Sequence, residues 1–131
     1  MYALHHPELF SSACPLSAYT GPLTLEDTKR SLSRRGGGDY TEEQVEAWYK
    51  EHNALELIKN RPADDIKAVR WFIDCGDDDF LFEGNSLAHI ALRKKEIPHE
   101  FRIRDGGHSW TYWRESLPVV LSFVSDAFHQ Y

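Results

Sequence analysis

The stretch that most constrains the fold is a nearly continuous apolar run, AVRWFIDCG, from Ala68 to Gly76. It combines β-branched and aromatic side chains, which favour a strand. It lacks the alternation of apolar and polar residues that a strand with one solvated face would show. Strands buried on both faces usually belong to parallel sheets that helices cover on both sides. The run therefore predicts a strand of a parallel sheet.

Two further stretches predict strands before and after this run. Small side chains from Ser11 to Ala18 predict a short strand, and a turn at 19–22 ends it. Between Ile97 and Arg104, Phe101 and Ile103 alternate with charged residues. This alternation suits an exposed edge strand.

Three stretches outside the middle of the chain predict helices. They are Tyr2 to Glu8, Glu83 to Lys95, and Ser116 to His129, with Pro118 in the first turn of the last. The last has an apolar stripe at helical spacing, made of Leu117, Val120, Leu121, Val124 and Phe128. Strands that alternate with helices predict an α/β fold with right-handed crossovers. We expect a three-stranded parallel sheet flanked by helices.

Residues 23–65 are polar, charged and helical in character. Thr41 and Gln44 have the spacing of a capping box, and Asn53 is placed to cap a following helix. The glycine-rich stretch from Arg34 to Asp39 predicts a flexible link. We therefore expect one domain over 1–131, with 23–65 as a helical insertion that lies over one end of the sheet.

Composition and charge exclude several classes of function. The 131 residues are 41% hydrophobic and 27% charged, which is enough for a packed core. A net charge of −6 argues against nucleic-acid binding, because that requires a basic face. No apolar run is long enough to span a bilayer, so we expect no membrane partner.

The chain has two cysteines, Cys14 and Cys75, and each lies in a short apolar run. Such cysteines are most often buried free thiols, although a single disulfide between them is an alternative. Neither has a cysteine or histidine close by in sequence, so we expect no metal site.

Two loops after the predicted strands contain the residues suited to chemistry. In α/β sheets, sites gather at the carboxyl ends of the strands. The first loop, CGDDDF, is either a solvated turn or a turn in which Asp79 points inward. It lacks the alternating ligands of a calcium loop. The second loop, DGGHSW, presents His108, which is either an ordinary loop histidine or the partner of Asp79.

The segment FIDCGDDDFLFEGNSLAHIALRKKEIPHEFRIRDGGHSWTYW resembles the C-terminal part of the esterase D and feruloyl-esterase-like family of α/β-hydrolases. The opening YALHHPELFSSACPLSA resembles the same family just beyond its nucleophile elbow. The resemblance implies a partial α/β-hydrolase fold. It also implies that Asp79 and His108 are the acid and base of a Ser-His-Asp triad.

The family's nucleophile lies in a Gly-x-Ser-x-Gly elbow, and this chain has no such motif. By the resemblance, the elbow would fall just before Met1. We therefore expect the chain to be the C-terminal portion of a longer esterase and to be inactive alone. Ser17 lies near the end of the first predicted strand but has no elbow around it, and Ser109 adjoins His108 with its side chain directed elsewhere.

For the longer protein, the resemblance implies hydrolysis of small acyl or hydroxycinnamoyl esters without a metal or organic cofactor. Trp110, Tyr112 and Trp113 follow His108 and suit packing, although Trp110 is a candidate for contact with substrate. The rival interpretation is a non-catalytic α/β module. By the resemblance, its first strand would have an unpaired edge, and such an edge favours a homo-oligomer.

Overall fold

The computed structural model describes residues 1–36 and 38–129. Its elements in chain order are α1 (Tyr2–His5), the 3-10 helix η1 (Pro7–Leu9), β1 (Ser12–Ala13), α2 (Leu25–Arg34), α3 (Glu42–His52), α4 (Ala54–Asn60), α5 (Ala63–Lys67), β2 (Arg70–Gly76), α6 (Phe82–Lys94), β3 (His99–Arg104) and α7 (Trp110–Phe128).

The three strands form one sheet in the order β1-β2-β3, and both pairings are parallel. β2 is the central strand and is buried almost throughout, as its apolar run predicts. β3 lies at one edge, with Trp71 opposite His99 and Gly76 opposite Arg104. These observations confirm the predicted α/β class and the three-stranded parallel sheet.

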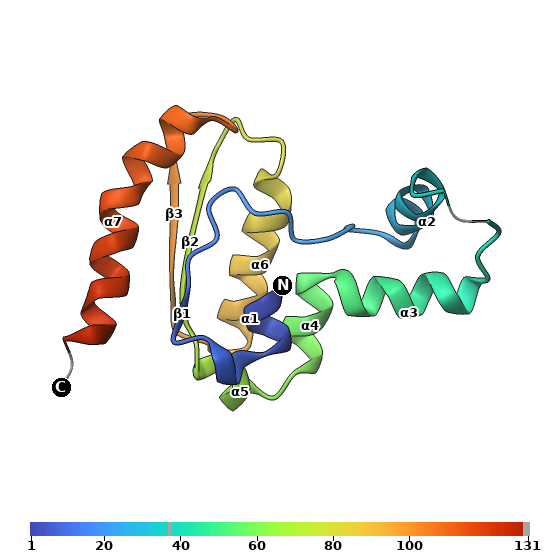
Figure 1. The fold of residues 1–131 in the computed structure, drawn as a ribbon, viewed down its shortest axis with the longest axis horizontal. Helices are drawn as coiled ribbons and strands as arrows, with labels where there is room; N and C mark the ends of the chain where they lie inside the picture. The colour runs from blue at the N-terminus through green and yellow to red at the C-terminus, as the bar shows by residue number, and fades with distance from the viewer. Residues whose placement is uncertain (37, 130–131) are drawn as a thin grey trace.

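The side chains of β2 alternate between two helical layers. Phe72 packs against Phe123 of α7, with 5.4 Å between the ring centroids. Trp71 and Ile73 join the main apolar core on the opposite face, together with residues of α1, α4 and α6. Figure 1 shows this arrangement, with α7 on one side of the sheet and α1, α4 and α6 on the other.

Residues 23–65 are helical, as predicted. The capping box of Thr41 and Gln44 is present, and the Asn53 side chain accepts hydrogen bonds from the first amides of α4. α4 packs against α6, whereas α2 and α3 pack on each other and project away from the sheet (Figure 1). We expected the whole segment to lie over one end of the sheet. Instead, only α4 and α5 lie close to the sheet. The predicted link at 34–39 includes Gly37, which lies outside the described residues.

The N-terminal elements are shorter than predicted because of two prolines. The helix expected over 2–8 ends at His5, and η1 follows it, since Pro7 restricts the residue before it. The strand expected over 11–18 is only Ser12–Ala13. Pro15 has no amide to give to the sheet, and pairing resumes as a single bridge between Leu16 and Asp74.

The prediction for the last helix was wrong at its start. α7 begins at Trp110, capped by the Ser109 hydroxyl, so Pro118 lies inside the helix. Tyr112, Ser116 and Phe123 are its buried residues. Three members of the expected apolar stripe are instead exposed, namely Leu117, Leu121 and Phe128. The prediction that this stripe is buried was wrong because α7 packs a different face against β2.

Both cysteines are free; Cys75 is buried and Cys14 is partly buried. Burial raises the pKa of the Cys75 thiol to about 11, and the nearby Asp79 carboxylate adds to this shift. In the described ranges, no helix combines the length and apolar character needed to cross a bilayer.

Candidate active site

The loops after β2 and β3 lie against each other at the carboxyl edge of the sheet. Gly76 makes this approach possible, since a Cβ on it would lie 2.0 Å from the Gly106 carbonyl oxygen. Three hydrogen bonds from backbone amides join the loops. The Asp77 amide donates to the Arg104 carbonyl (3.1 Å), the Asp78 amide to the Gly106 carbonyl (3.1 Å), and the Gly106 amide to Asp77 Oδ1 (3.1 Å). The loop that holds His108 is therefore fixed against the loop that holds Asp79.

Asp79 and His108 meet at this junction, as the sequence predicted. His108 Nδ1 lies 3.0 Å from Asp79 Oδ2 and 3.2 Å from Oδ1. The Asp79 side chain is fully buried, whereas 34% of the His108 side chain is exposed. Asp77 and Asp78 face solvent. Because Nδ1 faces the carboxylate, Nε2 is the ring nitrogen left for another partner.

The pKa of Asp79 lies below the ordinary value for an aspartate. Burial alone would raise this pKa, but hydrogen bonds outweigh burial. The donors are the Leu81 amide, 2.8 Å from Oδ1, the Ser17 hydroxyl and His108. The carboxylate is therefore ionised at neutral pH despite being buried. An ionised acid in this place orients the imidazole and stabilises its charged form.

Ser17 contributes to this site in a way that the sequence did not predict. It is 4% exposed, and its backbone has a φ of 49°, in the left-handed region. Its amide donates to the Asp74 carbonyl (2.8 Å), and its Oγ accepts a hydrogen bond from Trp113 Nε1 (3.0 Å). Ser17 thus links α7 to Asp79 as a positioning residue.

Aromatic rings flank the His108 imidazole. The rings of Phe80 and Trp113 each have their centroid 4.8 Å from it, and Trp113 is at 90°. Trp110, the predicted substrate contact, is 72% exposed and packs edge-on against Trp113 at 5.3 Å. The structure therefore brings Trp113, and not Trp110, against the histidine. Aromatic residues next to a glycine-histidine loop were the only sequence signal for this contact.

A second buried carboxylate, that of Asp74, stabilises the surroundings of the site through Tyr112 and Arg104. Asp74 is 1% exposed, accepts a hydrogen bond from the Tyr112 hydroxyl, and lies 3.8 Å from the Arg104 guanidinium. Burial, and then the hydrogen bond to Asp74, raises the pKa of Tyr112. The Tyr112 ring also covers Gly106, whose φ is 136°. These contacts fix the start of α7 to the loop that precedes His108.

The described residues include one cluster of side chains with metal-ligating atoms. Carboxylate oxygens of Asp77, Asp78 and Asp105 lie within 4.8 Å of one another, and all three residues are exposed. Asp77 already accepts the Gly106 amide, so part of this cluster stabilises the junction between the loops. The contact between Asp79 and His108 involves none of the cluster's side chains.

Comparison with known proteins shows the family to which the chain belongs. Residues 1–124 match the family described as "Putative esterase". A solved structure named ferulic acid esterase has a TM-score of 0.74 and 30% identity, over 97% of this chain and 45% of that one. No curated protein matches the chain.

Two further structures, both from Staphylococcus aureus, share the fold. They are the S-formylglutathione hydrolase FrmB and FphF, a fluorophosphonate-binding serine hydrolase, each with a TM-score of 0.66 and 24% identity. Each match covers 93% of this chain and 47% of the other, so the chain spans about half the length of these structures. The comparisons confirm a partial α/β-hydrolase fold, and the chain belongs to the esterase family of α/β-hydrolases.

Proposed function

We propose that the chain supplies the acid and base of a serine-type carboxylic ester hydrolase. His108 Nε2 takes the proton of an attacking serine hydroxyl, and the alkoxide oxygen bonds to the ester carbonyl carbon. The imidazolium returns this proton to the departing alcohol, which leaves an acyl-enzyme. A water molecule, deprotonated by His108 in turn, releases the acid and restores the serine. Asp79 remains ionised throughout.

The contact between His108 Nδ1 and Asp79 Oδ2, at 3.0 Å, carries this proposal. The two side chains are buried to different extents, and this difference supports a separate role for each. A fully buried carboxylate with a lowered pKa is suited to orient an imidazole, and a partly exposed imidazole can reach a substrate. Membership of the esterase family supports ester hydrolysis as the reaction.

In our proposal, none of the ten serines of this chain is the nucleophile. No Gly-x-Ser-x-Gly motif occurs in residues 1–131. The Ser17 hydroxyl accepts the Trp113 indole N–H at 3.0 Å, and its hydrogen bonding lowers the pKa of Asp79. We therefore expect no ester turnover by the chain alone, with the hydroxyl provided by a separate elbow.

For the substrate we propose small acyl or hydroxycinnamoyl esters. The name of the related ferulic acid esterase supports the second class. Aromatic rings of Phe80 and Trp113 beside His108 suit an aromatic acyl group.

A fusion protein tests the proposal. The serine-bearing remainder of the ferulic acid esterase is joined to Met1 of this chain, and hydrolysis of p-nitrophenyl acetate and methyl ferulate is measured. We expect hydrolysis that falls by about 10³-fold or more with His108→Ala or Asp79→Ala in a fusion that stays folded at the assay temperature. His129→Ala, an exposed histidine, is the matched control. Activity that survives His108→Ala in the folded fusion would reject the proposal.

A second candidate function is self-association without catalysis. In the described residues, β1 pairs with a strand only on its β2 side, and Leu117, Leu121 and Phe128 of α7 are exposed. An open strand edge and an exposed apolar helix face both favour a second copy of the chain. Sedimentation at micromolar concentration tests this: a dimer that Leu121→Glu converts to a monomer supports it, and a monomeric wild type rejects it.

A further inference from the structure

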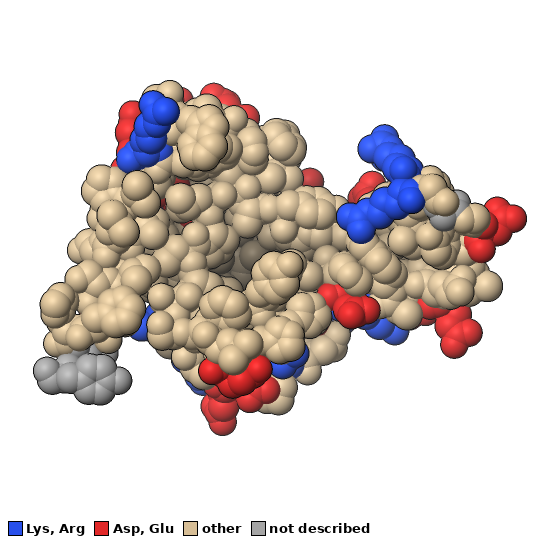
Figure 2. Space-filling model, in the orientation of Figure 1, with Lys and Arg blue, Asp and Glu red and all other residues tan. Residues whose placement is uncertain are grey.

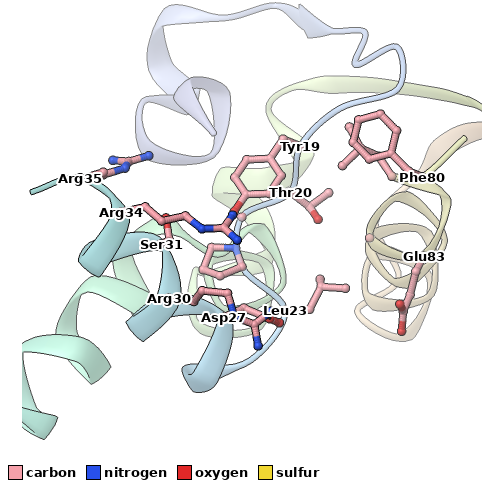
Figure 3. Close-up of a pocket in the computed structure, with 14 residues that line it drawn as sticks. Tyr19, Thr20, Leu23, Asp27, Arg30, Ser31, Arg34, Arg35, Phe80 and Glu83 are labelled. Atoms are coloured by element: carbon pink, nitrogen blue, oxygen red, sulfur yellow. The ribbon is translucent and has the colours of Figure 1, made fainter.

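A cleft lies between the insertion and the body of the fold, and its lining includes Phe80 and Leu81, which follow Asp79 in the chain. Its volume is about 420 Å³, which is within the usual range for small-molecule sites. α2 forms one wall, the start of α6 forms the other, and residues 19–23 form the floor. Figure 3 shows the side chains that line it.

The α2 wall of the cleft is cationic. Its arginines are Arg30 and Arg34, on consecutive turns of α2, and Arg35, which caps the C-terminal end of the helix. Lys and Arg side chains gather over α2 in Figure 2, although the chain as a whole has a net charge of −6. Within the described ranges, Arg34 and Arg35 form no salt bridge, and Arg35 packs over the Trp48 ring.

Two carboxylates also line the cleft, and neither neutralises Arg34. Asp27 is 3.7 Å from Arg30 and accepts a hydrogen bond from Thr24. Glu83 lies on the α6 wall, and its carboxylate points away from the arginines in Figure 3. Arg34 extends across the cleft toward Tyr19 (Figure 3). Its guanidinium is therefore a cation available to a ligand.

The cleft also has apolar lining residues, and one of them contacts His108. The apolar residues include Pro22, Leu23, Phe80 and Leu81. The Phe80 ring, 77% exposed, is the one whose centroid lies 4.8 Å from that of His108. A ligand in the cleft would thus contact a cation at one end and the neighbour of His108 at the other.

We propose that this cleft binds the carboxylate end of an anionic ester substrate. Arg34 holds the carboxylate, since a planar guanidinium can donate two parallel hydrogen bonds to it. The apolar lining accepts the spacer, and the ester group reaches His108. The proposal rests on the esterase function for the identity of the ligand, and it deepens that function by naming half-esters of dicarboxylic acids as a substrate class.

Binding to the chain itself tests the inference without any turnover. Monomethyl glutarate is titrated into the isotope-labelled chain while the Arg34 side-chain Nε–H and Phe80 ring resonances are followed by NMR. We expect both to shift with saturation, and we expect added salt to weaken the binding. Arg34→Gln should weaken it about tenfold, because an exposed charge-assisted hydrogen bond is lost. Arg93→Gln, at an exposed arginine of α6, should leave it unchanged.

Neutral dimethyl glutarate is the matched probe for charge. Three results would each overturn the inference. The diester could bind as tightly as the half-ester, or Arg34→Gln could leave binding unchanged. Alternatively, neither resonance could shift up to the solubility limit of the half-ester. Because these variants leave His108 and Asp79 intact, the outcome is separate from that of the fusion assay. Loss of hydrolysis there would reject the esterase proposal, whereas loss of binding here would reject only the anionic substrate.

Discussion

Gly76 and Gly106 approach so closely that a Cβ on Gly76 would lie 2.0 Å from the Gly106 carbonyl oxygen. This approach holds the ends of β2 and β3 side by side, and the hydrogen bonds between the loops begin there. The meeting of Asp79 and His108 therefore depends on a backbone contact three residues before Asp79 and two residues before His108.

Gly76→Ala should destabilise the chain by about 3 kcal/mol and separate the two loops, because the clash is with backbone and cannot be relieved by a side-chain rotation. Urea denaturation measures the loss. Gly38→Ala is the matched control, since nothing lies within 4 Å of its Cβ position, and it should change stability by less than about 1 kcal/mol. Equal effects of the two substitutions would show that the loop contact is not tight.

Ser17→Ala should raise the pKa of Asp79, because one of the hydrogen bonds that lower it is removed. Carbon-13 NMR titration of the Asp79 carboxyl group measures this pKa directly. Trp113→Phe keeps a ring beside His108 but removes the indole donor to Ser17, so it should raise the pKa less than Ser17→Ala does. An Asp79 pKa that is identical in wild type and Ser17→Ala would exclude the positioning role of Ser17.

Asp79→Asn should lower the free energy of unfolding at neutral pH and have less effect in acid. The pKa of Asp79 in the folded chain is below the ordinary value for an aspartate, so its ionised form stabilises the fold. This contribution is complete above the unfolded pKa and is lost as the pH falls through the folded pKa. Unfolding free energies of both proteins, measured from pH 7 downward, should therefore converge in acid. A constant difference across this range would contradict the lowered pKa.

Tyr112→Phe should destabilise the chain by about 1 to 3 kcal/mol, since buried Asp74 loses a hydrogen-bond donor while the ring over Gly106 is kept. Thermal unfolding followed by circular dichroism would detect the change. Tyr2→Phe, at a tyrosine that is 79% exposed, serves as the control and should be neutral. A neutral Tyr112→Phe would mean that Arg104 alone satisfies Asp74.

Much of the fold follows from local sequence patterns. The apolar run of β2 predicted a central buried strand, and the acidic and glycine-histidine loops predicted where Asp79 and His108 would meet. Local signals were weaker where proline intervened. Pro15 shortened β1, and Pro118 suggested a helix start in a helix that begins at Trp110.

The contacts of Ser17 could not be predicted for a related reason. Ser17 and Trp113 are 96 positions apart, and their hydrogen bond requires Trp113 to be in the first turn of α7. The sequence interpretation placed Trp113 in a loop, which gives no fixed position relative to β1. The Arg-lined cleft likewise depends on how the insertion packs, and helical periodicity within 23–65 does not determine this packing.

The tautomer of His108 tests the central claim most directly, because a general base in this arrangement must have Nδ1 protonated toward Asp79 and Nε2 free to accept a proton. Nitrogen-15 NMR of the imidazole in the chain, at a pH where the ring is neutral, reports which nitrogen holds the proton. We predict the Nδ1–H form in the wild type, with its hydrogen bond to the carboxylate weakened in Asp79→Asn. A neutral ring protonated on Nε2 in the wild type would contradict the account.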